Sequence, residues 1–239
     1  MLDTYKSARK SLEDDFGTPI CPVEWSHPTG NAPKSVLIVA LGPTKLDLLE
    51  MTTAHQPAAE VMDCDEVWGV NAGCNHLAGR VAYDMLWIMD HLAGEARTMP
   101  RYGYLIGQWA RRHRPSGSCI MTSQGADWAQ ANNVPGVHEY PLDWVLGKVG
   151  EDNAYFHNSV PYLLAYACAI GVEKIVLFGA DYSHEKSKRR EEDRANAEYW
   201  VGFCRAKGMD IYLPSTTTLC NANRGAWFYG YRDQPAIAD

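Results

Sequence analysis

The stretch NSVPYLLAYACAIGVEKIVLFGAD, from Asn158 to Asp181, decides the fold of this chain. Residues 160–170 are almost wholly apolar and include several Ala and Cys side chains, which suits a helix that packs closely on a sheet. Gly171 is placed to end that helix. Residues 174–178, KIVLF, form a short apolar run that is typical of a strand covered on both faces. The stretch therefore predicts a buried helix that leads into a central strand of a parallel sheet.

A second strand and helix are predicted near the start of the chain. The run SVLIVAL covers residues 35–41, and Gly42, Pro43 and Thr44 separate it from a helical pattern over residues 45–51. A strand, a glycine turn and a helix in this order can present backbone N–H groups to a phosphate. The turn has neither the GxGxxG pattern nor the Gly-Lys-Ser/Thr ending of a P-loop, so an ordinary turn between strand and helix explains it equally well.

Polar residues follow several of the predicted strands. Asn71 comes after the run EVWGV, Asp90 after MLWIM, and Gly179 and Asp181 after KIVLF. The carboxyl ends of parallel strands form the edge of a sheet where ligands bind, so we expect a site there. Ser159, at the start of the long helix, is a further candidate to bind a phosphate, and capping of the helix is the structural alternative.

The order of the apolar runs predicts the fold class. At least five such runs alternate with helical patterns, which predicts a three-layer α/β sandwich with a mostly parallel sheet. The length of 239 residues fits one domain, over residues 35–239. Residues 1–34 are broken repeatedly by proline and are expected to form an N-terminal accessory arm, which Trp25 anchors on the body.

Composition excludes two classes of protein. The seven cysteines include no CxxC pair, which is typical of a reduced, cytoplasmic protein rather than of a disulfide framework. No apolar run approaches the roughly 20 residues that a membrane span needs, and no signal peptide is visible. We therefore expect a cytoplasmic protein without membrane contact.

The charge is unevenly distributed along the chain. The net charge is −7, yet residues 97–114 carry five arginines, among them Arg111, Arg112 and Arg114, and no acid. A basic, aromatic-rich segment on an acidic body indicates an anionic partner, either a nucleotide or a nucleic-acid backbone. The alternative is a solvated helix end whose arginine stems cover apolar surface.

A strongly polar segment follows Asp181. Residues 182–194, YSHEKSKRREEDR, are expected to form a loop at the ligand edge of the sheet, which is the usual place for a lid. Its cationic side chains, including Arg189 and Arg190, could close on phosphates, and a plain solvated loop is the alternative.

Taken together, these motifs resemble a superfamily of bacterial proteins. The motifs are VLIVALGPT at 36–44, GVN at 69–71, NS at 158–159 and the continuation through AIGVEKI to GAD at 179–181. They resemble the sialyltransferases of the Campylobacter lipooligosaccharide type, the flagellin-associated motility accessory factors, the hydroxymethylpterin diphosphokinase-like proteins, and small bacteriophage proteins of similar length. The resemblance implies a Rossmann-like fold with a nucleotide bound at the strand ends.

The resemblance also implies roles for individual residues. It places a cytidine nucleotide and its sugar on Gly42, Pro43, Thr44, Asn71, Asp90, Ser159 and Gly179. The chain departs from the family pattern at Leu41, where an asparagine is usual, and in a shorter lid. These departures make transfer of sialic acid itself an unlikely activity.

The function predicted first is a metal-independent glycosyltransferase that uses a nucleotide-activated sugar, with a pyrimidine nucleotide favoured and no tightly bound cofactor. His184 is the predicted general base, because an imidazole titrates near neutral pH. Asp181 or Glu185 would orient or replace it, and Arg189 and Arg190 would stabilise the departing phosphate. If the chain is encoded by a bacteriophage, the acceptor would be a hydroxymethylated base in DNA in the host cytoplasm.

Two other functions stay open at this stage. A diphosphokinase acting on a small alcohol would need a divalent ion held by converging acids such as Asp90 and Asp181. A non-catalytic nucleotide-binding module would explain the lost turn asparagine and the short lid. Association of identical chains is compatible with the sequence.

Overall fold

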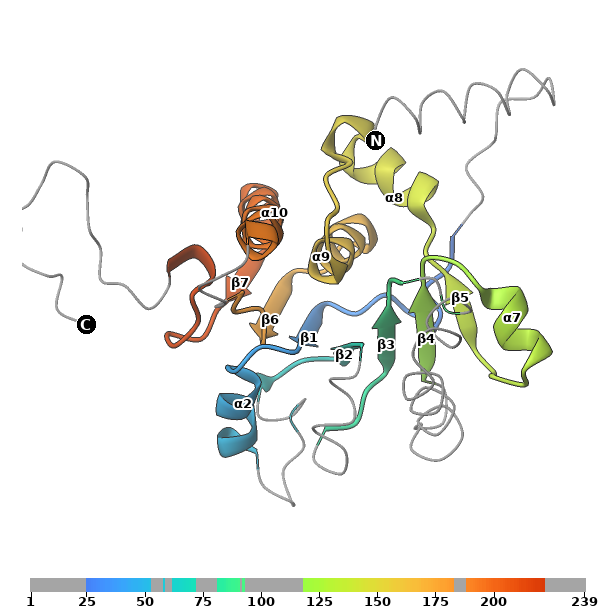
Figure 1. Cartoon of the computed structure of the whole chain (residues 1–239), viewed down its shortest axis with the longest axis horizontal. Helices are drawn as coiled ribbons and strands as arrows, with labels where there is room; N and C mark the ends of the chain where they lie inside the picture. The colour runs from blue at the N-terminus through green and yellow to red at the C-terminus, as the bar shows by residue number, and fades with distance from the viewer. Residues whose placement is uncertain are drawn as a thin grey trace, which may run out of the picture.

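The computed structural model describes residues 25–52, 58, 62–71, 81–90, 92, 118–182 and 188–221, without the side chains of residues 188–190 and 221. Within these residues the chain forms a seven-stranded sheet with helices on both faces (Figure 1). The strands are β1 (Ser35–Val39), β2 (Glu66–Val70), β3 (Met85–Ile88), β4 (Cys119–Thr122), β5 (Val137–Glu139), β6 (Lys174–Phe178) and β7 (Asp210–Tyr212).

The strand order is β5-β4-β3-β2-β1-β6-β7, and each pairing between described strands is parallel. The chain starts in the middle of the sheet at β1, adds β2 to β5 outward on one side, and returns to place β6 on the other side of β1. The predicted Rossmann-like α/β fold is therefore confirmed, and the direction of strand addition reverses between β1 and β6.

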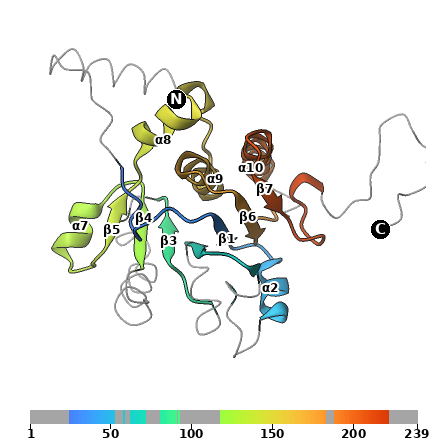
Figure 2. The same ribbon diagram turned by 180° about the vertical axis from the view of Figure 1, so that it is seen from behind.

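Helices form the two outer layers. On one face lie α8 (Leu142–Val149), α9 (Ser159–Ile170) and α10 (Lys188–Ala206), and on the other lie α2 (Lys45–Met51) and α7 (Ala126–Ala131) (Figure 1). The view from behind shows the same layering (Figure 2). Two short 3-10 helices cover Glu151–Asn153 and Leu219–Asn221. No helix in the described part of the chain is both long and apolar enough to cross a bilayer.

The apolar character of β1 follows from its place between the two layers. Val36 and Ile38 pack into the core under α9, whereas Leu37 and Val39 pack into the core on the opposite face. All four side chains are fully buried. A strand that is covered on both faces needs apolar residues at every position, which is why the run carries no alternation.

The ends of α9 are set by local chemistry. The side chain of Asn158 accepts a hydrogen bond from the N–H of Val160, as an N-cap does. Gly171 ends the helix in the left-handed conformation with a φ of 83°, and its N–H donates to the carbonyl of Cys168. The prediction that Gly171 ends this helix is confirmed.

The prediction of a loop over residues 182–194 is wrong for its second half. Helix α10 begins at Lys188, so Arg189 and Arg190 belong to its first turn. Glu, Lys, Arg and Ala favour a helix intrinsically, and the charged run simply extends the amphipathic helix that follows it. Residues 183–187 of the predicted lid lie outside the described residues.

The segment that precedes β1 is anchored by a buried polar cluster. The indole N–H of Trp25 donates to the hydroxyl of Tyr166 at 2.9 Å, as the predicted anchoring role requires. His27 Nδ1 lies 2.9 Å from the same hydroxyl, and His27 Nε2 lies 3.1 Å from a carboxylate oxygen of Glu66. Thr29 and Trp68 also donate to Glu66.

The indole in this cluster fixes the direction of one hydrogen bond. An indole can only donate, so the hydroxyl of Tyr166 accepts from Trp25, and the direction of its contact with Nδ1 of His27 follows the tautomer of the imidazole. Burial raises the pKa of Tyr166, which keeps its hydroxyl protonated. Nε2 of His27 lies within hydrogen-bond distance of both carboxylate oxygens of Glu66. The cluster is satisfied throughout, with the carboxylate of Glu66 as its final acceptor.

Stability is expected to depend on pH through Glu66. Burial alone raises the pKa of Glu66, but hydrogen bonds from His27, Thr29 and Trp68 together outweigh it, and the pKa lies below its ordinary value. A lowered pKa in the folded state contributes stability above the unfolded pKa of about 4.3, and that contribution is lost as the pH falls through the folded value.

The substitution Glu66→Gln is therefore expected to lower the free energy of unfolding by about 1.5–3 kcal/mol at pH 7, the usual range for hydrogen bonds to a charged group. The difference from wild type should shrink below about pH 4. Urea unfolding of both proteins from pH 7 to pH 3 measures it. A difference that stays constant over this range would show that the charge of Glu66 is not involved.

Candidate functional site

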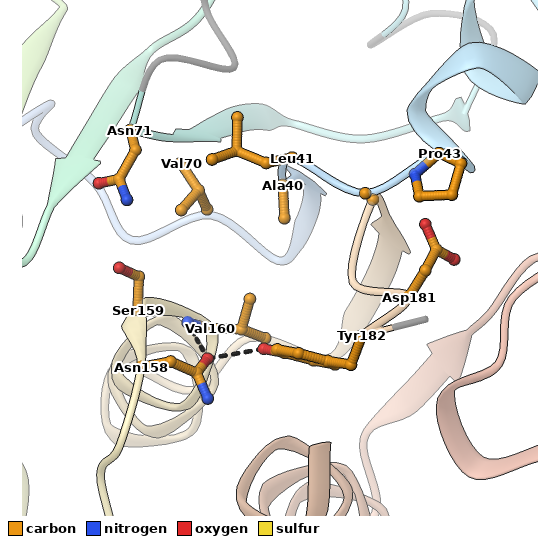
Figure 3. Close-up of a pocket in the computed structure, with 12 residues that line it drawn as sticks. Ala40, Leu41, Pro43, Val70, Asn71, Asn158, Ser159, Val160, Asp181 and Tyr182 are labelled. Carbon is orange, nitrogen blue, oxygen red and sulfur yellow. Dashed lines mark hydrogen bonds between the residues drawn. The ribbon is translucent and has the colours of Figure 1, made fainter. Parts of the chain in front are cut away.

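A cavity of about 220 Å³ lies at the carboxyl ends of β1, β2 and β6, beside the start of α9 (Figure 3). Its described lining comes from residues 40–43, 70–71, 158–160, 179 and 181–182. The position follows from the topology. After β1 the chain turns to α2 on one face, and after β6 it continues to α10 on the opposite face, so the two connections separate and leave a crevice between them.

Two glycines bring the ends of β1 and β6 together. The N–H of Gly42 donates to the carbonyl of Gly179 at 2.6 Å. A Cβ on Gly42 would lie 2.4 Å from Oδ2 of Asp181, and a Cβ on Gly179 would lie 2.4 Å from the carbonyl oxygen of Ala40. Gly179 also has a φ of 77°, which residues with a side chain rarely adopt. Both positions therefore need glycine for this close approach.

Thr44 and Asp181 close the same junction. Oδ2 of Asp181 accepts from the N–H of Thr44 at 2.8 Å and from its hydroxyl at 3.0 Å. The hydroxyl oxygen of Thr44 in turn accepts from the N–H of Gly179 at 2.8 Å. Asp181 and Thr44 are 2% and 4% exposed. We refer to Gly42, Thr44, Gly179 and Asp181 as the β1–β6 interlock.

The β1–β6 interlock occupies the backbone and side-chain donors of residues 42–44, which the sequence predicted to bind a phosphate. The N–H of Gly42 is bound to Gly179, the N–H and the hydroxyl of Thr44 are bound to Asp181, and Pro43 has no N–H. A carboxylate of the chain itself thus occupies the place that a bound anion would take. A phosphate would reach the turn only if the bond between Thr44 and Asp181 opened.

The second oxygen of Asp181 lacks a hydrogen-bond partner among the described residues. Oδ1 is buried, and Asp181 lines the cavity. A buried acceptor left unsatisfied costs about 1–3 kcal/mol, and more for a charged group. Asp181 lines the cavity, but Oδ1 itself is shielded from solvent, so a ligand could donate a hydrogen bond to it only after a local movement of the wall. A ligand that carries hydroxyl groups would supply such a donor.

Neutral polar groups lie on the opposite side of the cavity. Asn71 follows β2 with a φ of 50°, and Ser159 is the first residue of α9 (Figure 3). The N–H of Val160 is capped by Asn158 and Pro161 has no N–H, so the hydroxyl and N–H of Ser159 are the donors of this helix start nearest the cavity. The predicted residues Asn71 and Ser159 thus meet across one space.

Tyr182 and Asn158 form a bridge that sequence reasoning missed. The hydroxyl of Tyr182 donates to Oδ1 of Asn158 at 2.6 Å, which joins the end of β6 to the start of α9 along the cavity wall (Figure 3). Asn158 Nδ2 also donates to the carbonyl of Asp193 in α10. A tyrosine directly after Asp181 was visible in the sequence, but its partner 24 residues earlier was not.

Other predicted site residues lie elsewhere or outside the description. Asp90 is exposed at the end of β3 and does not line the cavity. The side chains of Arg189 and Arg190 are not described, although their place in α10 is. The remaining predicted residues, which lie outside the described residues, are His184, Glu185, Arg111, Arg112 and Arg114. The predicted roles of all these residues stay predictions.

The described lining carries one charged side chain, Asp181, and no lysine or arginine. Among the described residues no group of three or more His, Cys, Asp or Glu side chains could hold a metal ion. Lys45, which is outside the described lining, contacts it through Nζ, which donates to the carbonyl of Leu41 at 2.7 Å.

No protein-family model and no curated protein matches the sequence. Among solved structures, the chain is similar to the sialyltransferase CstII from Campylobacter jejuni in complex with the substrate analogue CMP-3FNeuAc, with 18% identity and a TM-score of 0.49 over 79% of this chain and 83% of that chain. It is also similar to the same sialyltransferase in complex with cytidine-5′-monophosphate, with 18% identity and a TM-score of 0.48 over 79% of this chain and 83% of that chain.

A third similar structure is the MAf glycosyltransferase from Magnetospirillum magneticum AMB-1. It has 13% identity and a TM-score of 0.51 and is matched over 81% of this chain, which spans 36% of that chain's length. At these identities the likeness shows the Rossmann-like fold alone, because one fold serves many activities.

The interlock predicts unequal effects for two glycine-to-alanine substitutions. Gly42→Ala places a methyl group against Oδ2 of Asp181 and the carbonyl of Gly179, and is expected to destabilise the protein by about 1–3 kcal/mol. Gly202→Ala, in the exposed middle of α10 with nothing within 4 Å, is the control and should stabilise by about 0.5–1 kcal/mol. Thermal unfolding of both variants tests this, and equal stability would contradict the interlock.

Proposed function

We propose that this chain is a glycosyltransferase that binds a nucleotide-activated sugar in the cavity between β1, β6 and α9. The observation that carries the proposal is the cavity at the strand ends, where Asp181, whose buried Oδ1 has no partner among the described residues, lies across from Asn71 and Ser159 (Figure 3). Ribose and sugar hydroxyls are the donors that such an oxygen needs. The motif resemblance to sialyltransferases and motility accessory factors supports the same class of ligand.

The arrangement suggests how the ligand lies. A phosphate 4 Å from a carboxylate is disfavoured by about 4 kcal/mol at the effective dielectric of a protein surface. The phosphates therefore lie away from Asp181, and the hydroxyl groups lie toward it. Asn71 and Ser159 on the opposite wall supply neutral donors for the remainder of the nucleotide.

In the proposed reaction, the oxygen of an acceptor hydroxyl attacks the anomeric carbon of the sugar. The bond from that carbon to the phosphate oxygen breaks, and the nucleotide leaves with both electrons. A base must take the proton of the acceptor hydroxyl. His184 is the predicted base, and Oδ1 of Asp181 is the described group in the cavity that could accept a proton in its place. No step requires a metal ion.

The finer points of the proposal rest on the sequence. We propose a pyrimidine nucleotide as the donor, as the resemblance implies. A hydroxymethylated base in bacteriophage DNA is proposed as the acceptor because of the basic segment over residues 97–114, with Arg111, Arg112 and Arg114 against the DNA backbone.

The geometry favours this function over the diphosphokinase. Asp90 follows β3 and Asp181 follows β6, with β2 and β1 between them. Three strand spacings place their backbones about 14 Å apart, which is too far for both carboxylates to hold one divalent ion. A metal site for the diphosphokinase could therefore use Asp90 or Asp181, but not both.

A ligand screen tests the proposed function. Pyrimidine nucleotides, CMP, UMP or UDP, are expected to raise the melting temperature without Mg²⁺, because a ligand that binds only the folded state stabilises it by mass action. GDP and ATP serve as purine comparisons, each with and without Mg²⁺. A shift confined to ATP with Mg²⁺ would favour the diphosphokinase. The absence of a shift with every nucleotide would contradict the proposed function and favour a non-catalytic interaction module.

Asp181→Asn tests the role of the carboxylate. The amide oxygen of asparagine can still accept from Thr44, so the fold should survive, while the amide group replaces the acceptor Oδ1 with a donor. Binding of the stabilising nucleotide is expected to weaken about tenfold or more, since a hydrogen bond to a charged group is lost. Calorimetric titration measures it. Asp210→Asn, at the exposed amino end of β7, is the control, and equal affinities of the two variants would exclude the role of Asp181.

A further inference from the structure

The proposed function leaves one chemical requirement without a described residue. A nucleotide that departs with its phosphate needs a cation or several donors close to the phosphate oxygens. In the described lining the one charged group is the carboxylate of Asp181, which repels a phosphate. The donors of the turn at residues 42–44 are bound within the β1–β6 interlock.

Lys45 lies where that requirement could be met. It directly follows Thr44 of the interlock, and its side chain turns back so that Nζ donates to the carbonyl of Leu41 at 2.7 Å. Leu41 is a lining residue of the cavity, so the ammonium group contacts the backbone of the lining, although Lys45 itself is not part of the lining. Lys45 is half-buried, so part of it is in contact with solvent.

The ammonium group has capacity for a ligand. It carries three N–H donors, and the described contact with Leu41 uses one of them. A lysine side chain has a flexible four-carbon stem and acts on phosphate as a point charge. It can therefore contact a phosphate oxygen beside Leu41 without any change in the β1–β6 interlock.

We infer that Lys45 binds the phosphate of the nucleotide beside Leu41, while Asp181 accepts hydrogen bonds from the hydroxyl groups of the same ligand. This inference rests on the proposed function and deepens it. It assigns the two opposite charges near the turn to the two chemically different parts of one ligand. It also differs from the sequence-based expectation that Arg189 and Arg190 bind the phosphate.

The test compares nucleosides with their monophosphates. Binding of cytidine, CMP, uridine and UMP is measured by calorimetric titration at low salt on wild type, Lys45→Met and Lys45→Arg. Lys45→Met is expected to weaken CMP or UMP binding about tenfold or more and to leave the nucleoside within about twofold, because only the phosphate contact is lost. Lys45→Arg keeps the charge and should recover most of the affinity.

Lys148→Met is the matched control, because Lys148 lies on α8 against the ring of Trp144 and away from the cavity lining. Equal affinity of wild type and Lys45→Met for the monophosphate would overturn the inference and leave the proposed function intact. Equal weakening of nucleoside and monophosphate would also overturn it, since Lys45 would then merely hold the carbonyl of Leu41. If wild type binds none of the four compounds, the proposed function fails and the inference fails with it.

Discussion

The hydrogen bonds between Asp181 and Thr44 are the constraint on which the rest of the site depends. They can form only because Gly42 and Gly179 let the ends of β1 and β6 approach so closely. The same junction is where the chain leaves for opposite faces of the sheet, so it fixes the position of the crevice. It also fixes the carboxylate of Asp181 beside the cavity, with Oδ2 bound to Thr44 and Oδ1 buried without a partner among the described residues.

Much of the fold could be predicted from the sequence because local chemistry and burial agree. The apolar run of β1 has no alternation, and both faces of that strand are indeed covered. Gly171 marks the end of α9, and the polar residues Asn71, Ser159 and Asp181 do meet at one edge of the sheet. Parallel strands bring their carboxyl ends together whatever the details of packing, so this part of the site follows from topology alone.

The remainder depends on contacts between distant residues, which no local pattern encodes. The turn at residues 42–44 suggested a phosphate cradle, but its donors are taken by a carboxylate 137 residues later in the chain. The partner of Tyr182 and the contact of Lys45 with Leu41 are likewise set by the folded geometry. The charged run over residues 182–194 was predicted to be a loop because its charge excludes it from the core. Charge does not prevent an exposed helix, and residues 188–194 form the first turns of α10.

The place of β1 in the sheet has a consequence for how the protein is made. Ser35 of β1 pairs with Lys174 of β6, so the first of the described strands along the chain pairs with the sixth, which is synthesised much later. Until β6 emerges from the ribosome, β1 can pair with β2 only, and it presents an apolar, unpaired edge of the kind that other chains can join. Closing so long a loop is slow. The cavity between β1 and β6 can therefore form only after β6 has been synthesised.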